Sequence, residues 1–168
     1  TGGKIRPGIM VLTRKAAERP EAKAIYTQGV AEGRSFEAIE KECKFPYVVY
    51  NIPGRTCTMI ETSTLKRISE FQNCIGVKEA TGNVGNMSEV IAEIALHNPR
   101  FQVLSGDDAL TLPLIALGGR GVISVVSNLV PREFSQLVDY ALKNEMDKAR
   151  AMQYKLAALF KTMFIETN

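Results

Sequence analysis

Three side chains that follow short apolar runs are the residues best suited to chemistry. Lys78 comes directly after Ile75–Val77, Tyr50 closes the run Phe45–Tyr50, and Arg55 follows shortly afterwards. An ammonium group at the end of an apolar run is costly to desolvate, and burial lowers the pKa of a lysine. A neutral amine can attack a ketone and form an iminium, which serves as an electron sink for carbon–carbon bond chemistry.

The tyrosine and the arginine suit the same chemistry. A phenol at Tyr50 can shuttle protons during imine formation. A guanidinium at Arg55 can hold a substrate carboxylate through a two-pronged hydrogen bond. Each residue also has a plain structural interpretation: Lys78 and Arg55 as solvated cations, and Tyr50 as an aromatic at the edge of the core. The residues taken singly leave both interpretations open.

Other kinds of site are disfavoured by residue type. The chain of 168 residues has one histidine, His97, and three cysteines without CxxC spacing. A zinc site and a Ser–His or Cys–His nucleophile are therefore not expected, and we predict that no cofactor is used. The two acids after Gly106, Asp107 and Asp108, are predicted to end a strand and cap a helix rather than to bind a metal. The cysteines are Cys43, Cys57 and Cys74.

Charge and hydropathy exclude further classes. The net charge is only +3, and basic residues are interleaved with acids, as in Glu37–Lys44, so no nucleic-acid surface is expected. No apolar run reaches the roughly 18 residues that a membrane span needs. An odd number of cysteines without a secretory signal favours a reducing cytoplasm.

Short apolar runs alternate with amphipathic stretches along the chain, which predicts an α/β fold. Runs without polar alternation are typical of a parallel sheet buried on both faces. Thr62 or Ser63 is the expected cap of the first of the predicted helices. The predicted strands are Phe45–Tyr50, Cys74–Lys78, Phe101–Ser105 and Gly121–Val126, with a weaker one near Ala22–Tyr26. The predicted helices are Ile60–Phe71, Asn86–Leu96, Asp108–Leu117, Pro131–Lys143 and one from Glu145 onward.

Polar residues gather just after these strands, which is the pattern of a (β/α)₈ barrel with its site at the carboxyl ends of the strands. They are Tyr50 and Asn51, Lys78 and Glu79, Gly106 and Asp107, and Ser124. No dinucleotide or P-loop fingerprint is present. A full barrel needs roughly 200 residues or more, so we expect an incomplete barrel over residues 1–130. Residues 131–168 are expected to form the last barrel helix and the start of a C-terminal helical region. A phosphate-binding barrel that uses Gly118–Gly121 is an alternative from another class.

Four motifs in order carry a resemblance to a known family. They are YNIPGRT (Tyr50–Thr56), IGVKEATGN (Ile75–Asn83), LSGDDA (Leu104–Ala109) and GGRGVISV (Gly118–Val125). Together they resemble the dihydrodipicolinate synthase family, from about Phe36 to the C-terminus. The resemblance implies a (β/α)₈ barrel with a C-terminal helical extension, usually a homotetramer. It also implies condensation of pyruvate with aspartate semialdehyde in lysine and diaminopimelate biosynthesis.

The resemblance assigns roles to particular residues. Lys78 would form the imine with pyruvate, and Tyr50 would be the central tyrosine of a proton relay. Arg55 would bind the carboxylate of the incoming aldehyde. Tyr26, in the segment YTQGVAEG (Tyr26–Gly33), would be the relay tyrosine that reaches a neighbouring subunit's site. The remaining substrate-binding positions would be Gly106, Ile123 and Thr81.

The chain departs from the family pattern near its start. Its first residues resemble the loop after the family's third strand, so the first three strands and their paired threonines would be absent. Leu12–Glu18 is similar to the next helix, although Pro7 and Gly8 fall where that helix should begin. The segment between Glu18 and Tyr26 is short, and the end of the chain precedes the family's final helices.

Three functions remain open from the sequence beside the phosphate-binding alternative. One is the synthase, which is favoured by Arg55 directly after Pro53–Gly54 and by Ala80–Gly82 after the lysine. A second is a related pyruvate aldolase, such as N-acetylneuraminate lyase or a 2-keto-3-deoxy sugar-acid aldolase, which shares the lysine and the tyrosine. The third is a non-catalytic remnant of the synthase.

The isolated chain is expected to be poorly stable or to depend on other chains. A barrel sheet that lacks three strands has two open edges and an uncovered core face. A thermal melt of the isolated chain measures this directly. A reversible and cooperative transition would contradict the prediction.

Overall fold

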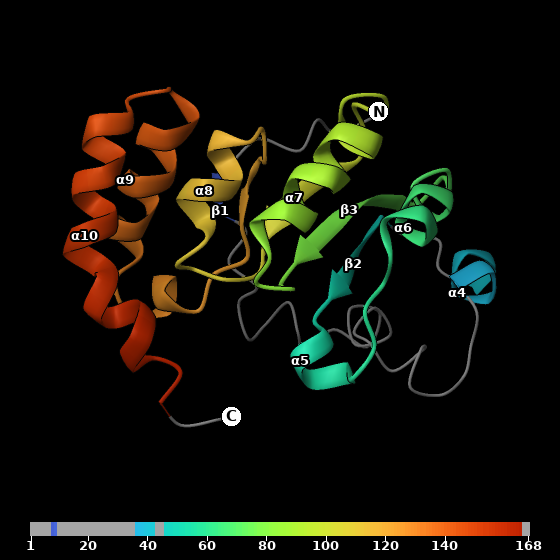
Figure 1. Ribbon diagram of the computed structural model, residues 1–168, viewed down its shortest axis with the longest axis horizontal. Helices are drawn as coiled ribbons and strands as arrows, with labels where there is room; N and C mark the ends of the chain where they lie inside the picture. Colours follow the sequence, from blue (N-terminus) through green and yellow to red (C-terminus); the bar gives the residue numbers. More distant parts are fainter. Residues whose placement is uncertain (1–7, 10–35, 43–45, 166–168) are drawn as a thin grey trace.

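The strands of the computed structural model form one parallel sheet, in the order β1-β5-β4-β3-β2 (Figure 1). The structure describes residues 8–9, 36–42 and 46–165. Strands β2 to β5 pair in chain order, whereas β1 lies beside β5. This is the pairing of consecutive strands in part of a (β/α)₈ barrel. The strands are β1 (Gly8–Ile9), β2 (Tyr47–Asn51), β3 (Cys74–Glu79), β4 (Gln102–Ser105) and β5 (Gly121–Val122).

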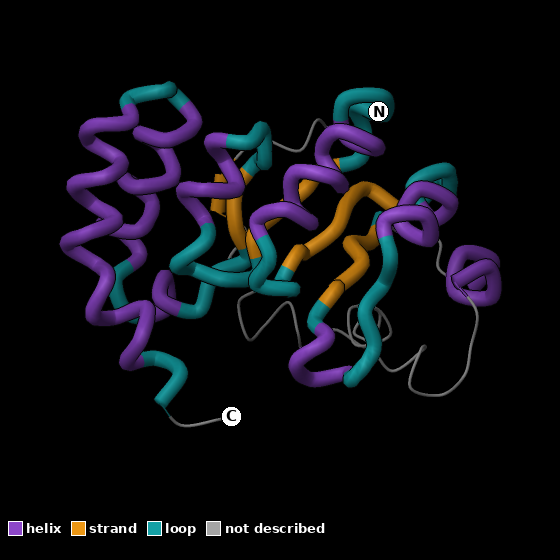
Figure 2. The backbone as a smooth tube through the Cα atoms, viewed as in Figure 1, coloured by secondary structure: helices purple, strands orange, loops and turns teal. Residues whose placement is uncertain are grey.

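Helices follow the strands and cover the sheet, and α9 and α10 lie side by side next to α8 (Figure 2). A π-helical turn, Ile91–Ala95, continues α7, and a 3₁₀ turn, Val126–Asn128, follows β5. None of the helices in the described ranges is long and apolar enough to cross a membrane. The helices are α4 (Phe36–Glu42), α5 (Pro53–Thr56), α6 (Thr62–Ile68), α7 (Val84–Val90), α8 (Thr111–Ala116), α9 (Pro131–Leu142) and α10 (Met146–Thr162).

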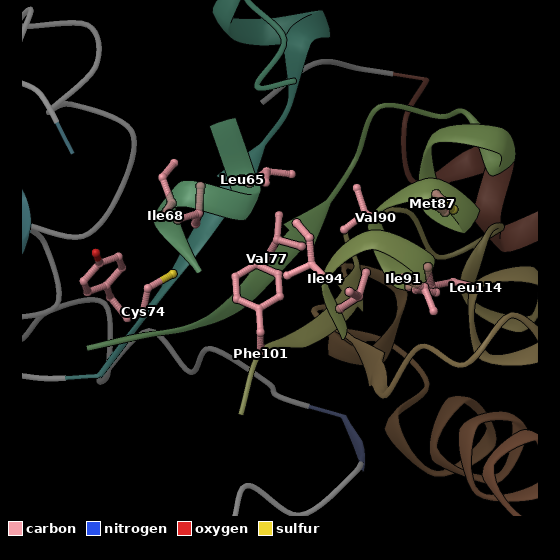
Figure 3. Packing of buried hydrophobic residues seen from close by; sticks show 13 residues of the cluster. Leu65, Ile68, Cys74, Val77, Met87, Val90, Ile91, Ile94, Phe101 and Leu114 are labelled. Carbon is pink, nitrogen blue, oxygen red and sulfur yellow. The ribbon is translucent and has the colours of Figure 1, made fainter. Parts of the chain in front are cut away.

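One apolar cluster joins strands β2 to β4 to the helices α6 and α7 (Figure 3). Val77 in β3 is fully buried and packs among Leu65 of α6, Ile94 of the π-helical turn and Phe101 before β4. Each such side chain contributes about 1.5–3 kcal/mol when it is removed from water. The apolar residues that recur every 3.6 positions on the helices belong to this cluster, and so do apolar residues of β3.

A second cluster packs α8, α9 and α10 around the last strand. Val122 of β5 is fully buried there, and Phe134 of α9 meets Phe160 of α10 edge to face, with ring centroids 6.0 Å apart. This arrangement fixes the helix pair against β5. The carboxyl end of β5 is thereby held in place from outside the sheet.

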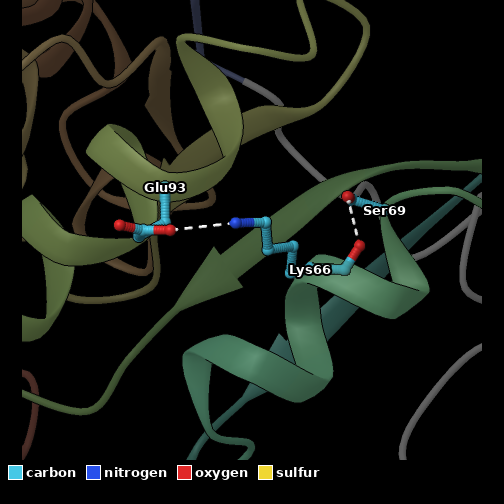
Figure 4. Close-up of polar contacts among 3 residues, drawn as sticks. All are labelled: Lys66, Ser69 and Glu93. Carbon is cyan, nitrogen blue, oxygen red and sulfur yellow. Dashed lines mark hydrogen bonds and ion pairs between the residues drawn. The ribbon is translucent and has the colours of Figure 1, made fainter.

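A surface ion pair adds little to this packing. Lys66 on α6 reaches Glu93 on the π-helical turn at 3.0 Å, while the Ser69 hydroxyl donates to the Lys66 carbonyl oxygen at 2.6 Å (Figure 4). Both side chains of the ion pair are more than half exposed. Exposed pairs of this kind contribute under about 1 kcal/mol, so the apolar clusters hold the helices.

The predicted strands from residue 45 onward are all present, but the last one is shorter than predicted. Pairing in β5 is limited to Gly121–Val122, and the Ile123 N–H still donates to the Ser105 carbonyl oxygen at 2.8 Å. The chain then turns into the 3₁₀ helix, where the Asp108 carboxylate accepts hydrogen bonds from two backbone N–H groups. A buried acid from the neighbouring loop therefore holds the backbone just after the strand, which no property of the apolar run itself indicates.

The predicted cap of α6 is wrong. Glu61 occupies the cap position with an extended backbone and no capping side-chain bond, and Thr62 is already the first helical residue. The Thr62 side chain is buried, so packing decides its position. The predicted strand at Ala22–Tyr26 and the predicted helix at Leu12–Glu18 lie outside the described residues.

Gly76 allows β3 and β4 to approach, and its replacement tests the sheet. A Cβ atom at this position would lie 2.2 Å from the carbonyl oxygen of Gln102, a backbone atom that cannot move without disrupting the pairing. We expect Gly76→Ala to lower the free energy of unfolding by about 3 kcal/mol or more, measured by urea denaturation.

Gly54 provides the matched control for this substitution. It is exposed, and a Cβ atom there would meet nothing within 4 Å. Gly54→Ala should therefore change the free energy of unfolding by less than about 1 kcal/mol. Equal stability of the two variants would show that the strand contact is not tight.

Candidate active site

The register of β2 and β3 brings the predicted lysine and tyrosine together. Tyr50 is paired with Lys78 across the two strands, and the Lys78 Nζ lies 3.9 Å from the centroid of the Tyr50 ring. The Lys78 side chain is buried, with 8% of its surface exposed. A cation over an aromatic face is stabilised by the ring quadrupole, so the phenol partly replaces the water that the ammonium loses.

Burial changes the acidity of this lysine. Loss of solvent lowers the pKa of Lys78 from 10.5 to about 8, and the negative charge of Asp108 opposes part of that shift. A lysine with a pKa near 8 is about one-tenth neutral at pH 7, against roughly one part in three thousand for an ordinary lysine. Lys78 therefore presents a much larger fraction of nucleophilic amine than a surface lysine does.

The loop after β4 packs directly against the stem of Lys78. A Cβ atom at Gly106 would lie 2.7 Å from the Cβ of Ala80 and 3.1 Å from the Cγ of Lys78. Any larger residue would therefore crowd both Ala80 and the stem of Lys78. The N–H of Gly106 donates to the Glu79 carbonyl oxygen at 2.7 Å.

At Gly106 and Ile123, the two predicted pocket positions, only the backbone carbonyl groups are open to a ligand. The N–H groups of Gly106 and Ile123 are both occupied by bonds between neighbouring strands. Ile123 is almost buried, with 8% exposed. A ligand near these positions would meet the carbonyl oxygens or the Ile123 side chain.

The segment that carries Arg55 is anchored to the end of β2. Asn51 is fully buried; its Oδ1 accepts from the Ile60 N–H at 3.0 Å, and its Nδ2 donates to the Ile60 carbonyl oxygen at 3.1 Å. Between these two residues the chain forms α5, in which Arg55 is exposed. The amide of Asn51 thus holds both ends of the arginine segment beside the strand that carries Tyr50.

A buried carboxylate extends this anchor to the next strand. Glu79 is fully buried and accepts from Asn51 Nδ2 at 3.3 Å, from the Thr81 N–H at 2.7 Å and from Asn86 Nδ2 at 3.4 Å. Buried charges need such partners, because an unpaired one carries a large desolvation penalty. This network fixes the loop after β3, where Thr81 lies.

Asn51 and Glu79 were expected only as polar residues at strand ends, and Asn86 was not expected to contribute. The available signal is that Asn51 and Glu79 directly follow the two candidate catalytic residues. In a strand, successive side chains point to opposite faces, so Asn51 and Glu79 turn away from Tyr50 and Lys78 and meet each other instead.

The structure brings Lys78, Tyr50 and Gly106 together. It places Arg55 in α5, which follows β2 (Figure 1), and Thr81 in the loop after β3. The predicted relay residue Tyr26 lies outside the described residues. Within the described ranges, no group of three or more His, Cys, Asp or Glu side chains is arranged to hold a metal ion.

The glycine run before β5 has a structural explanation. The N–H groups of Gly118 and Gly119 donate to the carbonyl oxygens of Ile115 and Leu114, each at 2.9 Å, and so end α8. These two donors are not available to cradle a phosphate. The phosphate-binding alternative therefore has no support from this loop.

Parallel strands with a buried lysine at their carboxyl ends define the (β/α)₈-barrel class of fold and site. Residues 26–168 match the Dihydrodipicolinate synthetase family, and the chain belongs to this family. It is 50% identical over 145 residues to the 4-hydroxy-tetrahydrodipicolinate synthase of Protochlamydia amoebophila, covering 85% of this chain and 48% of that relative. The corresponding synthase of Methanocaldococcus jannaschii is 47% identical over 146 residues, covering 85% of this chain and 49% of that relative.

Solved structures agree with this assignment. Dihydrodipicolinate synthase from Aquifex aeolicus superposes with a TM-score of 0.76 at 42% identity, covering 85% of this chain and 47% of that one. The enzyme from Thermotoga maritima gives 0.76 at 34% identity, covering 79% and 45%. The predicted family and the predicted incomplete barrel are confirmed. The chain spans about half the length of the curated relatives it matches.

The lowered pKa of Lys78 predicts how stability depends on pH. Between about pH 8 and 10.5 the unfolded chain binds more protons than the folded chain, so the free energy of unfolding rises with pH across that window. Lys78→Met removes this penalty. Its stability relative to the wild type should be greatest below pH 8 and should decline by about 3 kcal/mol by about pH 11.

Urea denaturation of the wild type and Lys78→Met over this pH range is the measurement. A stability difference that stays constant with pH would contradict burial of the ammonium group.

Proposed function

We propose that this protein condenses pyruvate with L-aspartate 4-semialdehyde to give 4-hydroxy-tetrahydrodipicolinate, a step of lysine and diaminopimelate biosynthesis, through a Schiff base on Lys78. The observation that carries the proposal is the buried Lys78 amine, with its lowered pKa, over the Tyr50 ring at the end of β3. The names of the curated relatives support it. A further solved relative, from Acinetobacter baumannii and 31% identical, is described as complexed with pyruvate.

In this proposal the neutral Nζ of Lys78 attacks the keto carbon of pyruvate. The carbinolamine that forms then loses water to give an iminium. The iminium withdraws electrons from the neighbouring methyl group, which releases a proton and leaves an enamine carbon as the nucleophile. That carbon bonds to the aldehyde carbon of the second substrate. The Tyr50 ring lies against the amine, and in this proposal its hydroxyl moves protons between nitrogen and oxygen during these steps.

The other predicted residues have binding roles in the proposal. Arg55 is exposed in α5, just after β2, and holds the carboxylate of the aldehyde substrate. Carbonyl groups at Gly106 and Ile123 border the pyruvate position, and Thr81 shapes the loop beside the lysine. Tyr26 completes the proton relay from a neighbouring subunit. No cofactor is required.

The setting of the protein belongs to the same proposal. We infer a homo-oligomer, a tetramer as in the family, because the relay tyrosine would come from another subunit. Residues 1–130 form the barrel part, and residues 131–168 form the last barrel helix and the start of the C-terminal helical region. The free thiols of Cys57 and Cys74 fit a reducing cytoplasm.

Reduction of the imine tests the function. Pyruvate followed by sodium borohydride should add about 72 Da to Lys78, located by peptide mass spectrometry, because the reduced adduct is a stable secondary amine. Lys66→Arg, which replaces an exposed lysine on α6, should trap pyruvate as the wild type does. Lys78→Arg should give no adduct. Absence of the Lys78 adduct in the wild type would overturn the proposal and favour a non-catalytic remnant.

A second arm separates the synthase from related aldolases. Turnover of pyruvate with aspartate semialdehyde supports the synthase. Cleavage of N-acetylneuraminate or a 2-keto-3-deoxy sugar acid, without condensation of the semialdehyde, would assign the chain to another aldolase. Both assays use the trapped and untrapped protein, so that turnover is tied to the Lys78 amine.

A further inference from the structure

Asp108 is a buried acid that the proposed mechanism does not yet use. It lies in the loop after β4, with 1% of its surface exposed. Its Oδ2 accepts hydrogen bonds from the N–H groups of Val125 and Val126, both at 3.0 Å. Those residues follow β5, so the carboxylate ties the carboxyl end of one strand to the segment that leaves the next.

The second oxygen of this carboxylate has a different environment. Asp108 Oδ1 is buried and has no hydrogen-bond partner among the described residues. A buried carboxylate with an unsatisfied oxygen is strongly disfavoured unless a positive charge lies near it. Lys78 is the cation next to this loop, because Gly106, two residues before Asp108, lies against the Lys78 stem. The negative charge of Asp108 raises the pKa of Lys78 and so opposes the effect of burial.

The backbone held by Asp108 borders the candidate site. Ile123, immediately before Ser124 and Val125, is bonded to Ser105 at the end of β4. Gly106 in the same loop as Asp108 touches the Lys78 stem. One carboxylate therefore acts on both the shape of the site and its charge.

We propose that Asp108 is a positioning residue for the chemistry of Lys78, fixing the Val125–Val126 backbone beside the site and supplying the negative charge that stabilises the cationic iminium. This inference rests on the proposed function. Only a protonated imine is an effective electron sink, and a nearby carboxylate favours the protonated form over the neutral one. Asp108 thus lowers the fraction of Lys78 that is neutral before the imine forms. Once the imine has formed, Asp108 promotes the loss of the pyruvate methyl proton.

Three other titratable side chains in the described part of the chain lie on the strands and the loop around Lys78 and Asp108. Tyr50 on β2 presents its ring to the amine, and Glu79 on β3 is occupied by amide donors. Asp107, next to Asp108, accepts the Ala109 N–H at 2.8 Å. The segment Ile123–Asn128 contains no titratable side chain.

The test separates the charge of Asp108 from its hydrogen bonds. Asp108→Asn keeps an amide oxygen that can accept from Val125 and Val126 but removes the charge, whereas Asp108→Ala removes both. Competitive labelling with acetic anhydride over a pH series, read by mass spectrometry, reports the neutral fraction of Lys78 without any substrate. In Asp108→Asn the labelling of Lys78 at pH 7 should rise at least about threefold, with unfolding close to that of the wild type. Asp108→Ala should be clearly destabilised.

A second readout follows the iminium. Exchange of pyruvate methyl protons in D₂O should slow at least about tenfold in Asp108→Asn at saturating pyruvate, because less of the imine is protonated. Asp107→Asn is the matched control: it makes the same charge change one residue away and should leave Lys78 labelling and proton exchange as in the wild type.

The outcomes are distinguishable. Unchanged Lys78 labelling and exchange in Asp108→Asn would overturn the inference, while a borohydride adduct in the wild type would still uphold the proposed function. The same shift in Asp107→Asn would also overturn it, by showing a general effect of net charge. No adduct in the wild type would overturn the proposed function and with it the role of Asp108 in imine chemistry, whereas the labelling would still decide whether Asp108 acts on Lys78.

Discussion

The burial of one ammonium group is the constraint around which the strand ends are arranged. Lys78 sits at the end of β3 with little exposed surface, and its pKa falls to about 8. A shift of that size corresponds to about 3 kcal/mol of stability lost at neutral pH. The loss would be larger without the negative charge of Asp108, which already opposes the shift, and the face of Tyr50 lies against the ammonium group. The same desolvation that destabilises the protein generates the nucleophilic amine.

The two buried acids near Lys78 contribute in different ways. Glu79 accepts hydrogen bonds from side-chain and backbone amides, and these bonds fix the loops that follow β2 and β3. Asp108 uses one oxygen on backbone N–H groups and leaves the other without a hydrogen bond in the described part of the chain. A fully bonded carboxylate stabilises geometry, whereas a partly bonded one keeps charge that can act on a neighbouring cation. The site thus combines a rigid frame with one acid that remains electrostatically active.

Features carried by local pattern were predictable from the sequence, and features made by contacts between distant segments were not. Apolar runs ending in Tyr50 and Lys78 predicted both strands and their polar ends, because parallel strands place those ends at one edge. The backbone after the short last strand is bonded to Asp108, which is far from Val125 in the chain. The two hydrogen bonds between the Asn51 amide and the Ile60 backbone likewise require the chain to fold back on itself, which the periodicity of the sequence does not predict. The resemblance to a family indicated the family and the expected roles of its residues. The effect of Asp108 on Lys78 depends on contacts between distant segments, so the sequence alone does not predict it.

The order of the strands explains why so much of the candidate site is encoded in one continuous stretch. In a barrel, strands that are consecutive in the chain are also neighbours in the sheet, so β2 to β5 bring their following residues to one sector of the rim. Each strand supplies one part there: the phenol of Tyr50, the amine of Lys78, the acid of Asp108 after β4, and the backbone after β5. The acidity of the lysine is consequently set within this sector.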